Sequence, residues 1–208
     1  RKQAMLNFNS ALLSVASDFV GQFAPYQSVE ITPAPEGGVF IASTDKGNIA
    51  CLAFDPSGTA DESTCIIPSK DLMKATKGIK TGDRNIQIND DQAVVTTYKK
   101  TTANQVIEVP VMRSTVAFAP LSKAIQNCLD RWTNTPTTSP TAGRYNLTYI
   151  NKALRSLSVF DSSIALSAFD GGPLRIQGAD NNLIILVMPQ TAEPIPKIPY
   201  WLEKYARK

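Results

Sequence analysis

The hydrophobic and polar positions of this chain switch repeatedly between a period of two and a period of about 3.6 residues, which predicts short strands alternating with single helices. In the first such unit, residues 3–8 form a predicted strand, and Asn9 is a candidate cap for a helix over residues 10–20. Turn-forming Pro and Gly residues then separate three predicted strands, at residues 29–32, 39–44 and 48–54. This part of the chain therefore predicts one strand, one helix and three strands.

The same order of elements returns in the next segment. A predicted strand at residues 64–67 leads to Ser69, a candidate cap for a helix that runs to about Lys77 and is closed by Gly78. Three more strands are predicted at residues 84–88, 93–98 and 105–111, with a hairpin turn at residues 89–91. Residues 1–113 therefore predict one complete domain built from two copies of the unit.

A third copy is shortened. Its strand is predicted at residues 115–119 and its helix at residues 121–132, but residues 133–143 are rich in Thr, Pro and Ser and have the composition of a linker. A fourth copy follows, with a strand at residues 144–147, a helix at 148–157 and strands at 163–168, 173–177 and 183–188. The tail, residues 190–208, contains a short amphipathic segment at 201–205. Residues 114–208 therefore predict an abbreviated second domain, and the predicted fold class is α+β.

The composition argues against catalysis. The chain has no histidine, which removes the His-dependent triads and dyads, the common zinc and iron sites, and the usual general base near neutral pH. Catalysis by a lysine or by a pair of carboxylates is left as a distant alternative. We therefore expect no enzyme activity, no metal and no cofactor.

Cysteine usage and hydropathy predict the compartment. Cys51, Cys65 and Cys128 are odd in number and lie in apolar surroundings, which favours buried, reduced thiols over a disulfide framework. The longest apolar run, residues 183–188, is far shorter than the roughly 20 residues that a bilayer requires. We therefore expect a cytoplasmic protein that makes no membrane contact.

Five local sequences resemble those of the bacterial DNA sliding clamps, the DNA polymerase III beta subunits. Residues 42–50 resemble the clamp segment A-T-D-G-H-R-L-A, with one extra residue and without its His and Arg. Residues 65–72 resemble V-I-P-R-K-x-L, and residues 145–154 are similar to F-N-x-x-Y-L-x-x-A-L of the final clamp domain. Residues 173–176 and 186–189 match the end of that domain, P-x-x-I followed by V-V-M-P-M. Together these matches touch most of the chain in the family's order.

This resemblance implies a DNA-clamp-like fold, in which repeated β-α-β-β-β units place helices along one face and antiparallel sheets on the other. The chain would correspond to the second and third domains of a three-domain clamp, shortened as in a phage or prophage version. Two features depart from the family: Gln190 replaces a Met, and the tail is longer by about 19 residues. The missing strands of the third unit also remove a sheet edge that ring closure by strand pairing would use.

In a clamp the helices line the central hole, so the resemblance implies that basic residues on helix faces contact the phosphates of duplex DNA. The basic residues at helical spacing are Lys70, Lys74 and Lys77 in the second helix, Lys123 and Arg131 in the third, and Lys152 and Arg155 in the fourth. The first helix carries only Asp18. Spacing alone favours ordinary solvated helix faces, and the resemblance reverses that preference for the group as a whole.

The resemblance also implies a groove beside the final strand that accepts short linear peptides from polymerases and repair proteins. Val187, Met188 and Pro189 would form part of its wall. The alternative is a core role, because the alternation along residues 183–188 turns only one of Val187 and Met188 inward. The tail could cover this groove with Ile195, Ile198 or Trp201.

The sequence therefore predicts a DNA-tethered processivity or recruitment factor that acts in DNA replication as a homo-oligomer. Its predicted partners are duplex DNA, bound without sequence preference, and a DNA polymerase or other replication proteins, bound through the groove. The alternative is a protein–protein interaction module with a clamp-derived fold that does not encircle DNA. The oligomeric state separates the two, because a monomer cannot enclose a duplex unless a partner completes the ring.

Overall fold

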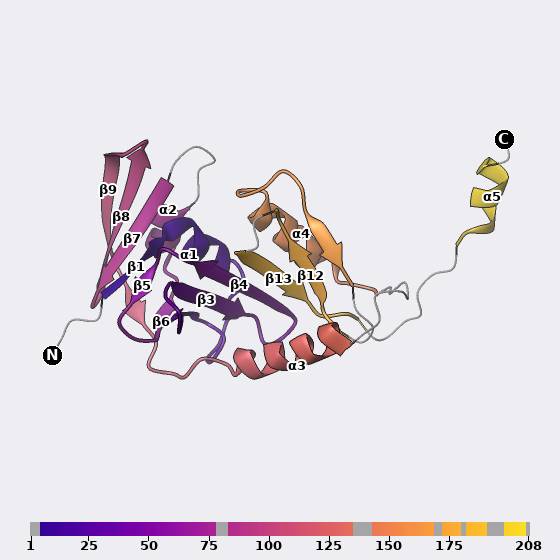
Figure 1. Ribbon diagram of the computed structural model, residues 1–208, viewed down its shortest axis with the longest axis horizontal. Helices are drawn as coiled ribbons and strands as arrows, with labels where there is room; N and C mark the ends of the chain where they lie inside the picture. Colours follow the sequence, from indigo (N-terminus) through magenta and orange to yellow (C-terminus); the bar gives the residue numbers. More distant parts are fainter. Residues whose placement is uncertain are drawn as a thin grey trace.

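The computed structural model describes residues 5–77, 83–134, 143–168, 172–179, 182–190 and 198–206. Two antiparallel sheets form its frame (Figure 1). The five-stranded sheet has the strand order β5 (Thr59–Ala60), β1 (Met5–Asn9), β7 (Asp83–Asn89), β8 (Gln92–Lys99) and β9 (Thr102–Pro110). The eight-stranded sheet has the strand order β10 (Met112–Arg113), β6 (Thr64–Ile67), β2 (Val29–Pro33), β3 (Val39–Thr44), β4 (Ile49–Asp55), β13 (Leu183–Val187), β12 (Leu174–Gln177) and β11 (Ala165–Ser167).

Each of the first two units lends its first strand to the other unit's sheet. Strand β1 leaves its own three strands and pairs with β7, whereas β6 pairs with β2. The fourth unit then joins the eight-stranded sheet through β13, which pairs with β4 over five residues, from Leu183 opposite Ala53 to Val187 opposite Ile49. One sheet therefore runs without a break from the first unit into the fourth.

Three helices lie on one face of this frame (Figure 1). Helices α1 (Ser10–Ser17) and α2 (Lys70–Thr76) contact each other between the two sheets, and α4 (Leu147–Leu157) packs on β13. Helix α3 (Leu121–Asn134) lies instead against the opposite face of the eight-stranded sheet. Helix α5 (Tyr200–Ala206) is the last element. The helices therefore divide between an inner face, formed by α1, α2 and α4, and an outer face that carries α3.

A capping side chain begins each of the three inner-face helices. The sequence predicts two of these caps, Asn9 and Ser69. The Asn9 Oδ1 atom accepts a hydrogen bond from the Ala11 amide at 3.0 Å, and the Ser69 Oγ atom accepts one from the Leu72 amide at 3.1 Å. Asn146 does the same for α4, with its Oδ1 atom 2.8 Å from the Thr148 amide nitrogen. Each cap satisfies an amide that has no partner within its helix, which contributes about 1 kcal/mol.

Alternation along the strands builds one continuous hydrophobic core. On β13, Leu183, Ile185 and Val187 point to the inner face and are at most 5% exposed. They join the same core cluster as Leu13 of α1 and Leu157 of α4. The predicted domains 1–113 and 114–208 thus share buried apolar surface along the β4–β13 seam.

Two predicted strands do not form. Residues 115–119 have no regular structure, and residues 144–147 keep only an isolated bridge between Arg144 and Gln190. The reason is the loss of partners. By analogy with β6, which pairs with β2 of the preceding unit, residues 144–147 would pair with the first of the three strands that the third unit lacks. Residues 115–119 would extend the sheet beyond β11, but they lead into α3 on the outer face.

The other predicted helices and strands are confirmed within a few residues, and the structure adds the short strands β5 and β10. The hairpin turn at residues 89–91 is also confirmed, with Asp90 at a φ of 49°. Gly78 and most of the predicted linker, residues 133–143, lie outside the described residues.

We predict that the β4–β13 seam is a principal source of stability. Ile185→Ala removes a fully buried side chain and should lower the free energy of unfolding by about 2–5 kcal/mol, measured by urea denaturation. Ile184→Ala, on the half-buried opposite side of the same strand, is the matched control and should cost clearly less. Equal losses in the two variants would contradict the assigned faces of β13.

Candidate functional site

The inner face carries a groove where α1, α2 and α4 meet, which we call the helix-face groove. Its volume is about 450 Å³. Lys74 and Lys77 of α2 line it from one side, Arg155 of α4 lines it from another, and Asp18 follows the end of α1. Arg155 lies about 80 residues from the two lysines in sequence, so the fold brings together basic residues from the second and fourth units.

Helix α2 turns its lysines outward because its opposite side is buried. Leu72, Ala75 and Thr76 are at most 5% exposed, whereas Lys74 and Lys77 are exposed. Arg84 of β7 donates hydrogen bonds to the carbonyls of Ala75, at 3.4 Å, and of Lys77. A guanidinium at the carbonyl end of a helix satisfies unpaired acceptors, so Arg84 fixes the turn that presents the two lysines.

Helix α4 holds Arg155 beside these lysines through its contacts with α1. The Ser156 Oγ atom donates a hydrogen bond to the Asp18 Oδ2 atom at 3.1 Å. The Lys152 Nζ atom lies 5.7 Å from the centre of the Phe19 ring, within the range of a cation–π interaction. Lys152 therefore helps to join α4 to α1, whereas Arg155 is exposed in the groove.

Asp18 is the one acidic side chain among the residues that line this groove. Partial burial raises the pKa of Asp18, while the hydrogen bond from Ser156 and the positive charges of Lys152 and Lys77 lower it. Three cations, Lys74, Lys77 and Arg155, therefore share the groove with a single carboxylate, and their excess positive charge favours an anion. The sequence shows Asp18 as the only charge of its helix, but its place among the lysines depends on tertiary packing.

The remaining predicted DNA-binding residues do not join this groove. Lys70 is exposed on the same side of α2, one turn before Lys74, but it does not line the groove. Lys123 is exposed on α3, which packs on the outer face, so Lys123 is not part of the helix face. Arg131 also belongs to α3, in a part of the helix whose side chains lie outside the described structure.

On the outer face, a second groove lies beneath α3, which we call the outer groove. It is lined by Thr44, Ile49 and Ala50 of the β3–β4 hairpin and by Pro173, Leu186 and Met188 of the last strands. Of the predicted wall residues, only Met188 takes part. Val187 is fully buried in the core on the other side of β13, and Pro189 is half-buried next to Met188 without lining the groove.

Helix α3 covers the outer groove, whereas the sequence suggests that the tail covers it. Leu121, Ala124, Ile125 and Cys128 of α3 line it, whereas Ile198 and Trp201 of the tail are 78% and 56% exposed and do not. Ile195 lies outside the described residues. The amphipathic pattern of α3 predicts a helix with one apolar side, but it does not tell which sheet face that side covers.

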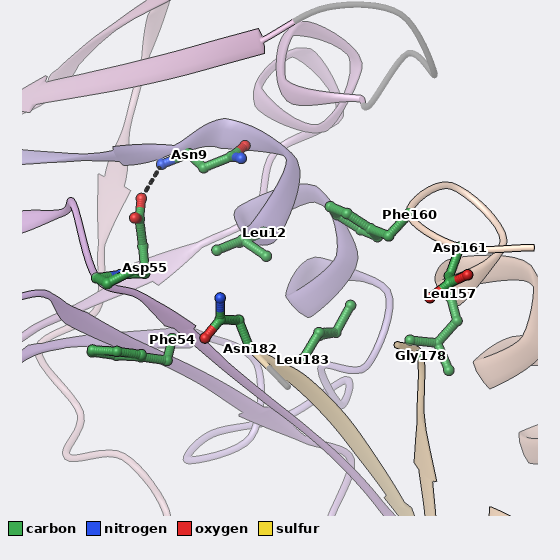
Figure 2. A pocket seen from close by; sticks show the side chains of 11 residues that line it. Asn9, Leu12, Phe54, Asp55, Leu157, Phe160, Asp161, Gly178, Asn182 and Leu183 are labelled. Atoms are coloured by element: carbon green, nitrogen blue, oxygen red, sulfur yellow. Dashed lines mark hydrogen bonds between the residues drawn. The ribbon is translucent and has the colours of Figure 1, made fainter. Parts of the chain in front are cut away.

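A third cavity, of about 130 Å³, lies where the first and fourth units meet (Figure 2). Leu12, Phe54, Phe160 and Leu183 surround it, and its two carboxylates already bind backbone amides. Asp55 accepts hydrogen bonds from the amides of Asn9, at 2.7 Å, and Ser57, at 2.9 Å. Asp161 accepts hydrogen bonds from the amides of Ala179, Ser162 and Ser163. These contacts brace the joint and leave the cavity largely apolar.

The described residues show no other constellation that points to chemistry. They contain no cluster of three or more His, Cys, Asp or Glu side chains that could hold a metal ion. None of the helices within the described ranges has the length and apolar character needed to cross a membrane. The three cysteines form no disulfide, and burial raises the pKa of the Cys51 and Cys65 thiols, which makes both weaker nucleophiles.

We predict that Asp161 stabilises the joint in a pH-dependent way. The three backbone amides lower its pKa below the ordinary value of 3.8, so its contribution is present above that value and is lost as the pH falls through the folded-state pKa. Asp161→Asn should therefore lower the melting temperature near neutral pH, and the difference from the parent should shrink as the pH falls below 3.8. A difference that is constant with pH would show that ionisation of Asp161 plays no part.

The comparison with known proteins supports the fold at low sequence identity. No family sequence profile matches the chain, and no curated protein sequence matches it. Among solved structures, the DNA polymerase III beta subunit of Borrelia burgdorferi aligns with 91% of this chain, at a TM-score of 0.57 and 10% identity. The beta subunit of Thermotoga maritima aligns with 96%, at 0.54 and 10%, and the DNA polymerase sliding clamp of Pseudomonas aeruginosa with 89%, at 0.55 and 11%.

The alignment with the Borrelia protein covers 64% of that longer chain, and those with the Thermotoga and Pseudomonas proteins cover 67% and 66%. The chain therefore spans about two thirds of the length of these proteins. The two antiparallel sheets and the exchange of first strands between the first two units, in which β1 pairs with β7 and β6 pairs with β2, belong to the part of the chain that aligns. The chain therefore has the fold of the DNA sliding clamps.

Proposed function

We propose that this protein is a non-enzymatic, DNA-associated factor that holds duplex DNA against its inner face. The observation that carries the proposal is the convergence of Lys74, Lys77 and Arg155 in one groove formed by three helices. Lysine and arginine side chains on helices suit phosphate contacts, which hold a duplex without reading its sequence. Such contacts fit a protein that stays on DNA while it moves along it.

The proposed contacts are electrostatic, so their strength depends on salt. Each phosphate that a cation neutralises releases condensed counterions, and the logarithm of the binding constant falls by about 0.9 per contact for each logarithmic unit of salt. A few contacts from one chain give weak binding, typical of non-specific complexes with dissociation constants of about 10⁻⁴ to 10⁻⁶ M. Stable retention on DNA would therefore need several copies.

We further propose that copies of the chain assemble into a ring or partial ring. Strands β9 and β11 each end a sheet, so each offers backbone groups for pairing with another chain. Leu166 of β11 pairs with the buried Ile176 and shares its face of the sheet, yet Leu166 is 60% exposed. An apolar side chain on the core side of an edge strand suits coverage by a second copy.

The outer groove is proposed to bind replication proteins, a DNA polymerase among them. It is apolar, it lies on the face opposite the proposed DNA contacts, and it includes Met188, a flexible side chain that adapts to different ligands. Binding there would leave the helix-face groove open to DNA. A protein–protein interaction module without DNA encirclement is the second candidate, and the outer groove is the observation that favours it.

The solution mass separates these two candidates. A discrete dimer or trimer by light scattering supports ring formation, because several copies of the chain are needed to enclose a duplex. A strict monomer across a range of protein concentrations would leave the interaction module as the better description. The distinction does not depend on which partner occupies the outer groove.

We predict that the three cations of the helix-face groove set the salt dependence of duplex binding. Replacing Lys74, Lys77 and Arg155 together by Ala should reduce the slope of log affinity against log salt by about 2–3 and weaken binding at low salt. Fluorescence anisotropy with a labelled random-sequence duplex measures both quantities.

Lys123→Ala is the control for this experiment, because Lys123 is exposed on the outer face. The control should bind DNA like the parent. A triple variant that binds like the parent, or a Lys123→Ala variant that loses as much affinity, would overturn the assignment of the inner face.

We also predict that Asp18 limits DNA affinity. Asp18→Asn keeps an oxygen that can accept the Ser156 hydrogen bond but removes a negative charge, so it should tighten duplex binding about two- to fivefold at low salt. Because the pKa of Asp18 is raised, lowering the pH toward that pKa should strengthen binding by the parent more than by the variant.

Asp130→Asn removes the same charge from α3 on the outer face and serves as the control, with Asn still able to accept the hydrogen bond from Gln126. Its effect on duplex binding should be small. Equal gains in the two variants would indicate a general effect of net charge rather than a local one at the groove.

A further inference from the structure

Helix α3 is the occupant of the outer groove. Its apolar side chains Leu121, Ile125 and Cys128 are spaced by four and three residues, which places them on one side of a helix. They face Ala50 and Leu186, which are paired across β4 and β13. The opposite side of α3 is polar and exposed, with Ser122, Gln126 and Asn127 among its residues. The groove is therefore filled by an amphipathic helix of the same chain.

The two sides of this contact are not buried equally. On the sheet side, Ala50 is 7% and Leu186 is 5% exposed. On the helix side, every residue from 121 to 130 is half-buried or exposed, and Leu129 is 46% exposed. A cavity of about 80 Å³ is left between the two. Leu13 of α1, Leu72 of α2 and Leu157 of α4 are at most 1% exposed, so the docking of the described part of α3 is loose compared with that of the inner-face helices.

The attachment of α3 allows it to leave without disturbing the sheets. Residues 114–120 before it form no strand or helix, and the last buried anchor on that side is Ala119, at 8% exposure. None of the residues 121–130 of α3, the part whose side chains the structure describes, belongs to the core cluster that joins the sheets to α1 and α4. Removal of α3 would uncover an apolar surface formed by Ala50, Leu186 and Met188, which is the kind of patch that binds a partner.

We propose that α3 is a displaceable resident ligand of the outer groove, and that the groove takes an amphipathic helix in trans when α3 leaves. This inference rests on the proposed role of the outer groove as a partner site. The pattern of α3 defines the ligand: apolar residues at positions i, i+4 and i+7 of a helix with a polar opposite side. A partner helix must compete with α3, so its apparent affinity falls with the fraction of molecules in which α3 is docked.

The test opens the groove by substitution and offers it a helix. Ile125→Asp places a charge on the apolar side of α3, and Asn127→Asp places the same charge on its exposed side as the matched control. The probe is a fluorescein-labelled synthetic peptide of residues 119–132 of this chain, and the same peptide with Ile125→Asp is the negative probe. Met188→Glu undocks α3 from the sheet side, at a position that is 44% exposed and therefore tolerant of substitution, but it also places a charge in the groove that the peptide must enter.

Cys128 reports independently on the position of α3, because its thiol is half-buried in the groove. Modification by a maleimide, followed by mass spectrometry of the Cys128 peptide, should be faster in Ile125→Asp and Met188→Glu than in the parent and Asn127→Asp. The probe peptide should bind Ile125→Asp at least about tenfold more tightly than the parent or Asn127→Asp, and Met188→Glu, whose groove carries a charge, should not bind it. The negative probe should bind none of them.

Two results would overturn the inference. One is equal Cys128 reactivity in all four proteins, which would mean that α3 does not undock. The other is fast Cys128 modification in Ile125→Asp without peptide binding, which would mean that the uncovered groove does not take a helix. The DNA proposal is judged separately, by duplex titration of the same variants, because the outer groove and the helix-face groove share no residue. Circular dichroism confirms that each variant is folded.

Discussion

The antiparallel pairing of β4 with β13 is the interaction on which the rest of this structure depends. It joins strands more than 120 residues apart in sequence through five residue pairs, and it turns two half-sheets into one. Because β13 carries α4 with it, the pairing sets α4 beside α1 and brings Arg155 to Lys74 and Lys77. On its other side, the same seam places Leu186 next to Ala50 and forms the floor of the outer groove. Both candidate sites are therefore consequences of one strand pair.

The β4–β13 seam also separates a charged face from an apolar face, because the side chains of a strand alternate between its two sides. Successive side chains of β13 point to opposite faces, so Val187 enters the core under the inner-face helices while Leu186 and Met188 face outward. The inner face carries exposed cations in one groove with the Asp18 carboxylate, and the outer face carries an apolar groove covered by α3. Charge and apolar surface on opposite faces would allow a nucleic acid and a protein helix to bind without competing.

Much of this architecture can be predicted from the sequence, because the helix caps and the alternation of apolar residues act locally and hold here. Asn9 and Ser69 cap helices where predicted, and strand β3 lies at its predicted residues. The failures occur where an element needs a partner that is absent. Residues 144–147 have strand character but lack the three strands of the third unit, so only the Arg144–Gln190 bridge remains. Sequence periodicity records which side of an element is apolar, and it does not record which surface that side meets.

The same limit explains the candidate sites. Lys74 and Lys77 could be assigned to a helix face from spacing, and their meeting with Arg155 follows from the repeated units. Lys123 has the same spacing as the other basic residues, but its helix α3 lies on the outer face. A complete third unit would place this helix on the inner face. Asp18 could be identified only as an isolated charge, because its neighbours Lys77, Lys152 and Ser156 come from other helices.

Lysine footprinting tests the central claim most directly, namely that the inner face is the surface that meets DNA. The protein is treated with an amine-reactive acetylating reagent, with and without a saturating duplex, and modification is quantified at each lysine by mass spectrometry. The account predicts that DNA protects Lys74 and Lys77 while Lys123 on the outer face reacts as before. Protection of Lys123 with unchanged reactivity at Lys74 and Lys77 would contradict it.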